Sequence, residues 1–316
     1  MPTSQPADDR QSPTAHARPR LLIPYLVLAV SLLLTAGVAA YVASVTEARE
    51  RARFDSAVER TQMAISQRIE TYVNLLLGGA GLFASDTTIT GKEFRKYVDR
   101  LRLRERYPGI QGIGVSARVP GWKKRDLEER IRREGNADFA IRPPEPRDEY
   151  HAIIYIEPFD QRNRAAVGYD MFTEPTRRAA MELARDTGRP ATTGRVTLVQ
   201  EIDADRRQAG FLIYVPVYHL GLNPEAPAAR RLALAGFVYA PFRANDFLGG
   251  IFAGDRHPEG IEFAVYDGNA DPSTAEPLAA FADSEAPRTQ SPPGVSPATV
   301  PPAINPAAVE GSALPS

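Results

Sequence analysis

The chain has 316 residues, of which 43% are hydrophobic and 24% are charged, a composition typical of a globular protein with one large domain or two small ones. Its formal net charge of −1 argues against nucleic-acid binding, because such proteins carry a basic excess on at least one face. The chain has no cysteine, which excludes a disulfide framework and thiolate chemistry.

The first 44 residues predict a tail and a membrane anchor. Residues 1–20 are polar, and we expect a disordered cytoplasmic tail. Residues 21–44 carry no charge and are long enough, as a helix, to cross ~30 Å of hydrocarbon. The alternative is a signal peptide cleaved near 38–40, but the apolar cores of signal peptides span only about 7–15 residues. We therefore expect a transmembrane helix. Arginines flank it on both sides, so charge alone leaves its orientation open.

Residues 45–85 have the periodicity of a stalk helix. Val58, Ile65 and Tyr72 are seven residues apart, as in the seam of a two-helix coiled coil, which favours a homodimer. The alternative is that this apolar stripe packs on its own domain. Residues 79–84 (GAGLFA) loosely fit a dinucleotide-binding template, which requires a preceding strand. Because the preceding residues predict a helix, the small residues indicate close packing or a bend instead.

Residues 86–282 should form the folded core, with fold class α+β. Helices are expected from Thr90, whose capping box would use Glu93, to Tyr107, at 121–135, and from an N-cap at Thr173 to Gly188. Short connections between the later strands predict antiparallel pairing. Residues 283–316 are rich in proline and should be disordered. Strand patterns cover 110–119, 151–158, 195–202, 210–218, 232–242 and 262–268.

No pattern in the chain indicates an enzyme. The sequence has no nucleophile, phosphate-binding or kinase signature, and its four histidines are scattered, so we predict no metal site and no cofactor. A pair of acids could perform hydrolytic acid–base chemistry, but such pairs occur in any chain of this length. The acids that could form such a pair are Glu157, Asp160, Asp170 and Glu201.

Five blocks in chain order carry a family resemblance: 107–114, 150–163, 167–188, 193–200 and 210–218. They resemble the CHASE domain, the extracytoplasmic sensor of bacterial and plant receptors whose outputs are histidine kinases or nucleotide cyclases. The resemblance covers roughly residues 54–268. It implies a stalk helix, tandem PAS-like lobes, a dimer, and a small molecule bound in the membrane-distal lobe. It also implies a single-pass protein of the cell inner membrane with a periplasmic sensor domain.

The resemblance also implies a ligand site. In the plant cytokinin receptors, an aspartate matching Asp170 hydrogen-bonds a purine-type ligand, and a threonine matching Thr187 lies just behind the pocket. Adenine-type compounds are therefore one ligand class to test. With Thr173 as the N-cap, Asp170 would be available to a ligand, although capping of the turn is the alternative role. Leu198, Phe211, Tyr214 and Tyr155 are the expected apolar and aromatic walls.

In one respect the sequence departs from the family, whose domains are normally followed by a second span and an output module. Here the proline-rich tail follows instead, so we expect either a truncated receptor or a stand-alone sensor that pairs with another protein. The expected function is a membrane-anchored ligand sensor without its own output module. The alternative is a dimerising interaction protein that binds no ligand.

Overall fold

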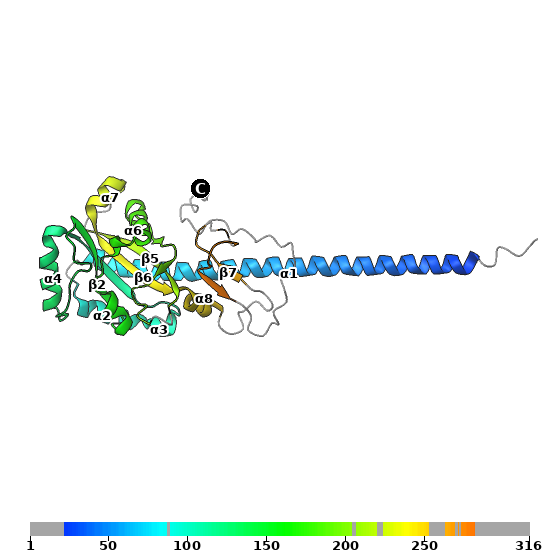
Figure 1. Ribbon diagram of the computed structural model, residues 1–316, viewed down its shortest axis with the longest axis horizontal. Coiled ribbons are helices and arrows are strands. Elements are labelled where there is room, and N and C mark those ends of the chain that lie inside the picture. Colours follow the sequence, from blue (N-terminus) through cyan, green and yellow to red (C-terminus); the bar gives the residue numbers. More distant parts are fainter. Residues whose placement is uncertain are drawn as a thin grey trace, which may run out of the picture. The chain divides into compact units, whose positions relative to one another are not determined.

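The computed structural model describes residues 22–86, 89–203, 207–219, 224–252, 263–268, 271 and 273–281 (Figure 1). The tails expected at 1–20 and 283–316 lie outside the described residues. The chain divides into two compact units, Met1–Glu59 and Arg60–Ser316, and the second contains the sheets described below.

The expected transmembrane and stalk segments are parts of one helix, α1, which runs from Leu22 to Ser85. No proline or glycine interrupts residues 38–77, so nothing in the sequence breaks the helix at the boundary expected near residue 44. By length and composition this helix could cross a membrane, and none of its most apolar window is buried.

The last part of α1 packs on its own domain. The Tyr72 side chain is fully buried, its ring lies 5.0 Å from that of Phe242, and its hydroxyl donates to the carbonyl of Pro108. Tyr72 is therefore unavailable for a seam between two copies, and a homodimer contact elsewhere on α1 stays a prediction. Gly79 lies close to the sheet, since a Cβ there would come within 3.2 Å of Val238, as the close-packing interpretation expected.

The core is an antiparallel six-stranded sheet with strand order β2-β1-β6-β5-β3, in which β4 also pairs with β5. A separate antiparallel pair joins β7 and β8. This arrangement confirms the α+β class and the antiparallel pairing. The strands are β1 Ile113–Pro120, β2 Glu149–Glu157, β3 Ala191–Thr192, β4 Val196–Thr197, β5 Ala209–Tyr218, β6 Leu234–Arg243, β7 Phe263–Val265 and β8 Ala279–Phe281.

The helices begin and end largely where the sequence patterns place them. The capping box of α2 is present, with Thr90 N donating to the Glu93 carboxylate at 2.9 Å and Glu93 N donating to Thr90 Oγ1 at 3.4 Å. The other elements are α2 Gly91–Leu101, α3 Leu103–Arg106, η1 Gly121–Lys123, α4 Lys124–Arg133, α5 Gln161–Ala166, η2 Met171–Thr173, α6 Pro175–Thr187, α7 Pro227–Ala233 and α8 Ala244–Phe252.

The strand predicted at 195–202 is wrong beyond its first residues, because only Val196–Thr197 pair with β5. The chain then turns, with Glu201 N donating to the carbonyl of Leu198 at 3.0 Å. The turn lets the buried Glu201 carboxylate accept two hydrogen bonds from Arg243, at 2.7 and 3.0 Å. After Thr197, the ion pair between Glu201 and Arg243 takes the place of the β-strand pairing that the hydrophobic pattern predicted.

Both faces of the large sheet are covered. Because successive side chains of a strand point to opposite faces, Phe211 and Tyr214 of β5 lie on different sides. Phe211 stacks on Phe242, with centroids 5.0 Å apart, on the face that packs against α1 and α2. The Tyr214 hydroxyl donates to Met171 Sδ at 3.3 Å, on the face that packs against η2 and α6. Figure 1 shows α6 beside β5 and α2 beside β2.

Candidate functional site

Asp170 lies at the start of η2, beside the middle of β2, and its side chain is fully buried. One carboxylate oxygen, Oδ1, accepts hydrogen bonds from the backbone N–H groups of His151, at 2.9 Å, and Phe172, at 3.2 Å. These two bonds join η2 to the sheet. Asp170 therefore has a structural role, whatever else it does.

The second carboxylate oxygen of Asp170 has no hydrogen bond from the described part of the chain. Its nearest charged neighbour is Arg147 Nη1, at 3.7 Å, which is an ion-pair distance but too long for a good hydrogen bond. A buried carboxylate oxygen without a donor is costly. The site therefore has an unused acceptor of high strength.

Other buried polar atoms on the same face of the sheet are also without hydrogen-bond partners among the described residues: Ser116 Oγ, His151 Nδ1 and the Tyr239 hydroxyl. The ring of His151 lies 5.8 Å from that of Phe237, the residue paired with Ser116 across β1 and β6. These atoms and the free oxygen of Asp170 mark this face as polar at its centre, although apolar side chains surround it.

Tyr239 reaches this position because a glycine lies beneath it. A Cβ on Gly114 would be 2.4 Å from atoms of the Tyr239 ring, so any larger residue in β1 would displace the ring. Burial raises the pKa of Tyr239 well above its usual value. Tyr239 is thus a neutral phenol that can donate one hydrogen bond and accept others.

The surroundings of His151 determine which of its two ring nitrogens can accept a hydrogen bond. Its Nε2 lies 2.9 Å from Glu149 Oε1, and burial lowers the pKa of His151, which makes the neutral ring the stable form at pH 7. The hydrogen bond with His151, together with that from Arg118 at 2.6 Å, lowers the pKa of Glu149 to about 2. Because ionised Glu149 can only accept, the His151 proton sits on Nε2, and Nδ1 is an acceptor facing the interior.

The expected N-cap at Thr173 is wrong. Glu174 caps α6, since its carboxylate accepts from Thr176 N at 2.9 Å and from Arg177 N at 2.8 Å. The reason is that Pro175 occupies the first helical position, which makes the residue immediately before it the cap. Thr173 instead donates its hydroxyl hydrogen to the carbonyl of Asp170 at 2.7 Å. Asp170 thus caps η2 with Oδ1, while its Oδ2 accepts no hydrogen bond from the described residues.

The structure brings only some of the predicted site residues together. Tyr214 lies on the same face of the sheet as Asp170. Leu198 also lies there, towards the edge, packed on Gly210 so closely that a Cβ at Gly210 would be 2.6 Å from its Cγ. Phe211 lies on the opposite face, as does Tyr155, whose ring is 6.2 Å from that of Phe94 in α2.

Tyr155 changes face because of a β-bulge. Counting alternate residues along β2 places it with His151. The register shifts between Val115 and Ser116 of β1, however, so that Ile153 pairs with Ser116 and Tyr155 pairs with Val115. The extra residue in β2 turns Tyr155 towards α2. On that side its hydroxyl donates to Glu134, the C-cap residue of α4, at 2.6 Å.

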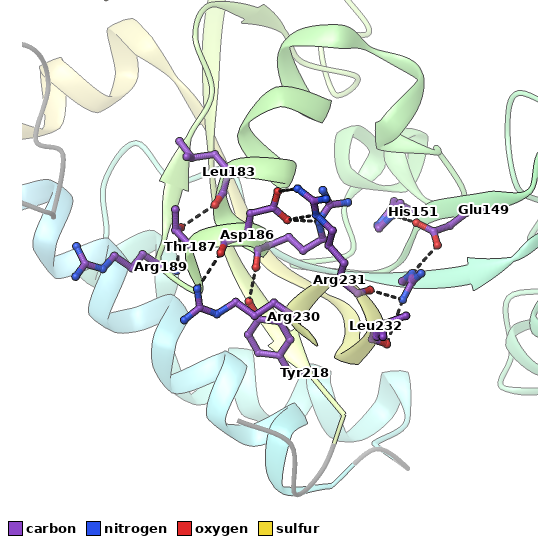
Figure 2. A network of polar contacts seen from close by, with 12 residues as sticks. Glu149, His151, Leu183, Asp186, Thr187, Arg189, Tyr218, Arg230, Arg231 and Leu232 are labelled. Atoms are coloured by element: carbon purple, nitrogen blue, oxygen red, sulfur yellow. Dashed lines mark hydrogen bonds and ion pairs between the residues drawn. The ribbon is translucent and has the colours of Figure 1, made fainter. Parts of the chain in front are cut away.

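Thr187 lies at the far end of α6, in the polar network that Figure 2 shows. Its side chain is exposed, and its hydroxyl donates to the carbonyl of Leu183 at 2.7 Å. The adjacent Asp186 accepts from Arg231 at 2.6 and 3.0 Å, and these bonds, with that from Arg185, lower the pKa of Asp186. This network holds the end of α6 against α7.

The remaining candidate acids have structural partners. Glu157 accepts from Arg95 at 2.8 Å, and Asp160 caps α5 by accepting from Asn163 N at 3.0 Å. Glu201 is held by Arg243, as described above. Within the described ranges, no group of three His, Asp or Glu side chains is arranged to hold a metal ion.

A cavity of about 480 Å³ opens next to Arg147. Trp122, Lys124 and Tyr150 are among its other lining residues. The side chain of Arg147 connects this cavity to Asp170, because it lines the one and pairs with the other. The buried carboxylate is thus one side chain away from solvent-accessible space.

The comparison with protein families decides the identity. The sequence model of the CHASE domain matches residues 87–278, which is more than half of the chain. The chain belongs to the CHASE domain family. CHASE domains are extracytoplasmic sensor domains, and the matched range contains Asp170, the large sheet and the helices α2 to α8, whereas α1 lies before it.

Among solved structures, the chain is similar to the ligand-binding domain of the amino acid chemoreceptor PctC of Pseudomonas aeruginosa PAO1, in complex with GABA. The two are 17% identical, the match covers 66% of this chain and 69% of that one, and the TM-score is 0.38. No curated protein matches the sequence.

Sequence reasoning missed three residues of the candidate site: His151, Arg147 and Tyr239. His151 was set aside because the histidines are scattered along the chain. The usable signal was the position of His151 in the middle of a strongly apolar strand, which is uncommon for a polar residue unless it has partners there. Nothing in the sequence indicates Arg147, because it reaches Asp170 from a loop.

Proposed function

We propose that this CHASE domain is the extracytoplasmic sensor of a membrane-anchored signalling protein, and that it binds a small molecule through Asp170 on the face covered by η2 and α6. The observation that carries the proposal is the second carboxylate oxygen of Asp170, which is buried and has no hydrogen-bond donor in the described structure. In this proposal α1 anchors the protein in the inner membrane and the sensor domain lies in the periplasm.

The energetics favour a ligand with an N–H donor. A hydrogen bond to a charged group contributes about 1.5–3 kcal/mol, which corresponds to a 10- to 150-fold difference in affinity. A donor from a ligand would also relieve the burial of the unpaired oxygen. His151 Nδ1 offers a second acceptor on the same face, and the Tyr239 hydroxyl offers a donor. A compact molecule with both N–H groups and acceptors, such as an adenine-type compound, fits this set.

In this proposal, a movement of η2 creates the space for the ligand. Asp170 lines neither the cavity beside Arg147 nor a smaller one beside Phe211, because Met171 and Phe172 fill the space above His151 and Tyr214. A shift of the three-residue η2 would open the site towards the Arg147 cavity. Tyr214 and Leu198 would then be walls of the pocket.

Three residues of the expected site have indirect roles in this proposal. Tyr155 and Phe211 hold α2 and α1 against the other face of the sheet, and Thr187 helps to end α6. None of them would touch the ligand. A homodimer would use exposed apolar side chains of α1 such as Phe54 and Met63, which are 45% and 55% exposed.

The test is a thermal-shift screen of the full chain in lipid nanodiscs with adenine-type compounds and other small periplasmic metabolites. Asp170→Asn is the critical variant, because its amide oxygen can still accept both backbone hydrogen bonds while its NH₂ group replaces the free acceptor. We expect at least a tenfold loss of affinity. The matched control is Asp186→Asn, which changes an acid outside the site and should respond as the wild type does.

An equal response of Asp170→Asn and the wild type would refute the role of Asp170. If no compound stabilises the wild type and the protein is captured by another receptor without any ligand dependence, the alternative function as an interaction protein is favoured. Topology is checked separately, by fusing a reporter that is active only in the periplasm to the C-terminus.

A further inference from the structure

A second, smaller cavity of about 160 Å³ lies on the opposite side of the large sheet from Asp170. Its walls come from α1, β5, α8 and the β7–β8 pair, all within the second compact unit. The side chains from α1 are Ile65 and Ile69, which are one helical turn apart and therefore share a face. Phe211, Leu248, Val265 and Ala279 are among the others.

Two of the polar side chains at this cavity, Thr193 and Asp267, are already bonded to the protein. Thr193 Oγ1 accepts from Leu212 N at 3.0 Å, in the sheet. Asp267 Oδ2 accepts from Arg195 N at 2.9 Å. A charged ligand would gain little from groups that have partners, and would lose its hydration on entering. Because most of the lining side chains are apolar and these two polar groups are engaged, the lining favours an uncharged, apolar occupant.

The size of the cavity sets the size of the occupant. An apolar cavity of about 150 Å³ stays dry and binds benzene or xenon, because water finds too few hydrogen-bond partners there. We propose that the cavity between α1, α8 and the β7–β8 pair is a second ligand site, which takes an uncharged apolar or aromatic molecule about the size of one benzene ring. This site is independent of the one at Asp170.

The position of the site gives it a direct effect on α1. An occupant contacts Ile65 and Ile69, so its binding energy depends on where that stretch of α1 lies against the sheet. A ligand shifts a conformational equilibrium only by its difference in affinity between the two states. Because this cavity is partly built from α1, any displacement of Ile65 and Ile69 changes the affinity for the occupant.

The probe is benzene, added to the full chain in lipid nanodiscs while the unfolding temperature is measured. At about ten times the Kd, the expected rise in Tm is roughly 3–6 °C. Two variants fill the cavity from different walls: Ala279→Leu from β8 and Ala244→Leu from the start of α8. Both should abolish the rise. Asp170→Asn is the matched control and should show the full rise, because it lies on the other face.

The proposal is overturned if the wild type shows no rise, or if both filled variants show the same rise as the wild type, which would place the benzene in the lipid or elsewhere. Circular dichroism identifies a variant that does not fold, and the other variant then decides the result. A rise that is lost in Asp170→Asn but kept in both filled variants also contradicts the proposal, because it assigns the benzene to the Asp170 face.

Discussion

One carboxylate oxygen of Asp170 supports the fold and the other is proposed to bind a ligand. The first role allows a quantitative prediction of what substitutions at Asp170 do to stability. Asp170→Ala removes the acceptor of two backbone hydrogen bonds, those from His151 N and Phe172 N. Asp170→Asn keeps an oxygen in the same place. The difference between the two variants therefore measures the structural role alone, without any ligand.

The magnitude follows from the two bonds. Each buried N–H left without an acceptor costs about 1–3 kcal/mol, so the loss in Asp170→Ala is about 2–6 kcal/mol before any compensation. Removal of the carboxylate also relieves the burial of its unpaired oxygen, which offsets part of the loss. We expect a net decrease in the free energy of unfolding of about 2–4 kcal/mol. For Asp170→Asn, which loses the charge assistance of the two bonds and the long ion pair with Arg147, we expect about 1 kcal/mol.

The assay is equilibrium unfolding in urea of the full chain, followed by near-ultraviolet circular dichroism. This signal reports the packing of the tyrosines, several of which are fully buried in the core, including Tyr214 and Tyr239. The chain's single tryptophan, Trp122, is 77% exposed and would be a poor reporter. Equal stabilities of the two variants, or an Asp170→Ala protein within about 0.5 kcal/mol of the wild type, would refute the structural role.

Three further predictions concern stability. Gly79→Leu should cost about 1–3 kcal/mol in thermal unfolding, because a Cβ at this position meets a side chain of β6 at 3.2 Å, whereas Gly81→Leu, with nothing within 4 Å, should be neutral or stabilising. Because burial lowers the pKa of His151, the unfolded state binds more protons below about pH 6.5, so the free energy of unfolding should fall as the pH drops from about 7.5 to 5.5, by at most about 1.4 kcal/mol per pH unit. His151→Gln should flatten that slope in urea titrations at each pH, and an unchanged slope would contradict it. Glu201→Gln should cost about 3–5 kcal/mol in the same titrations, because it breaks a buried ion pair. Glu276→Gln, in an exposed pair, should leave the stability nearly unchanged, and similar losses in the two variants would count against the difference in burial.

The elements of this fold follow from local patterns, and for that reason the sequence predicts them well. The capping box of α2 and the apolar runs of β2, β5 and β6 are set by neighbouring residues, so they are visible without knowledge of the tertiary structure. The strand predicted at 195–202 was wrong because its hydrophobic pattern is overridden by a distant partner, Arg243, which holds Glu201.

The candidate site was harder to predict, because it depends on how distant segments meet. The role of Asp170 in ligand binding was expected through the family resemblance and stays a prediction; the structure shows that its side chain is buried. Tyr155 was expected beside it, but the bulge in β2 turns it to the other face, and a bulge leaves no reliable signal in a single sequence. Arg147 reaches the carboxylate from a loop between α4 and β2, where no periodicity constrains the direction of a side chain.

Strand β6 lies between the proposed ligand site on one face of the sheet and helix α1 on the other. Tyr239 faces the proposed ligand and Val238, the next residue, faces Gly79 of α1, with no side chain on the helix to cushion the contact. A conformational change at the proposed ligand site would therefore have to pass through only one peptide unit to reach α1. Since peptide units are rigid, a tilt of the strand that makes room on one side must press or release the helix on the other. One peptide unit of β6 is thus all that separates the side chain facing the proposed ligand from the side chain facing α1 at this point.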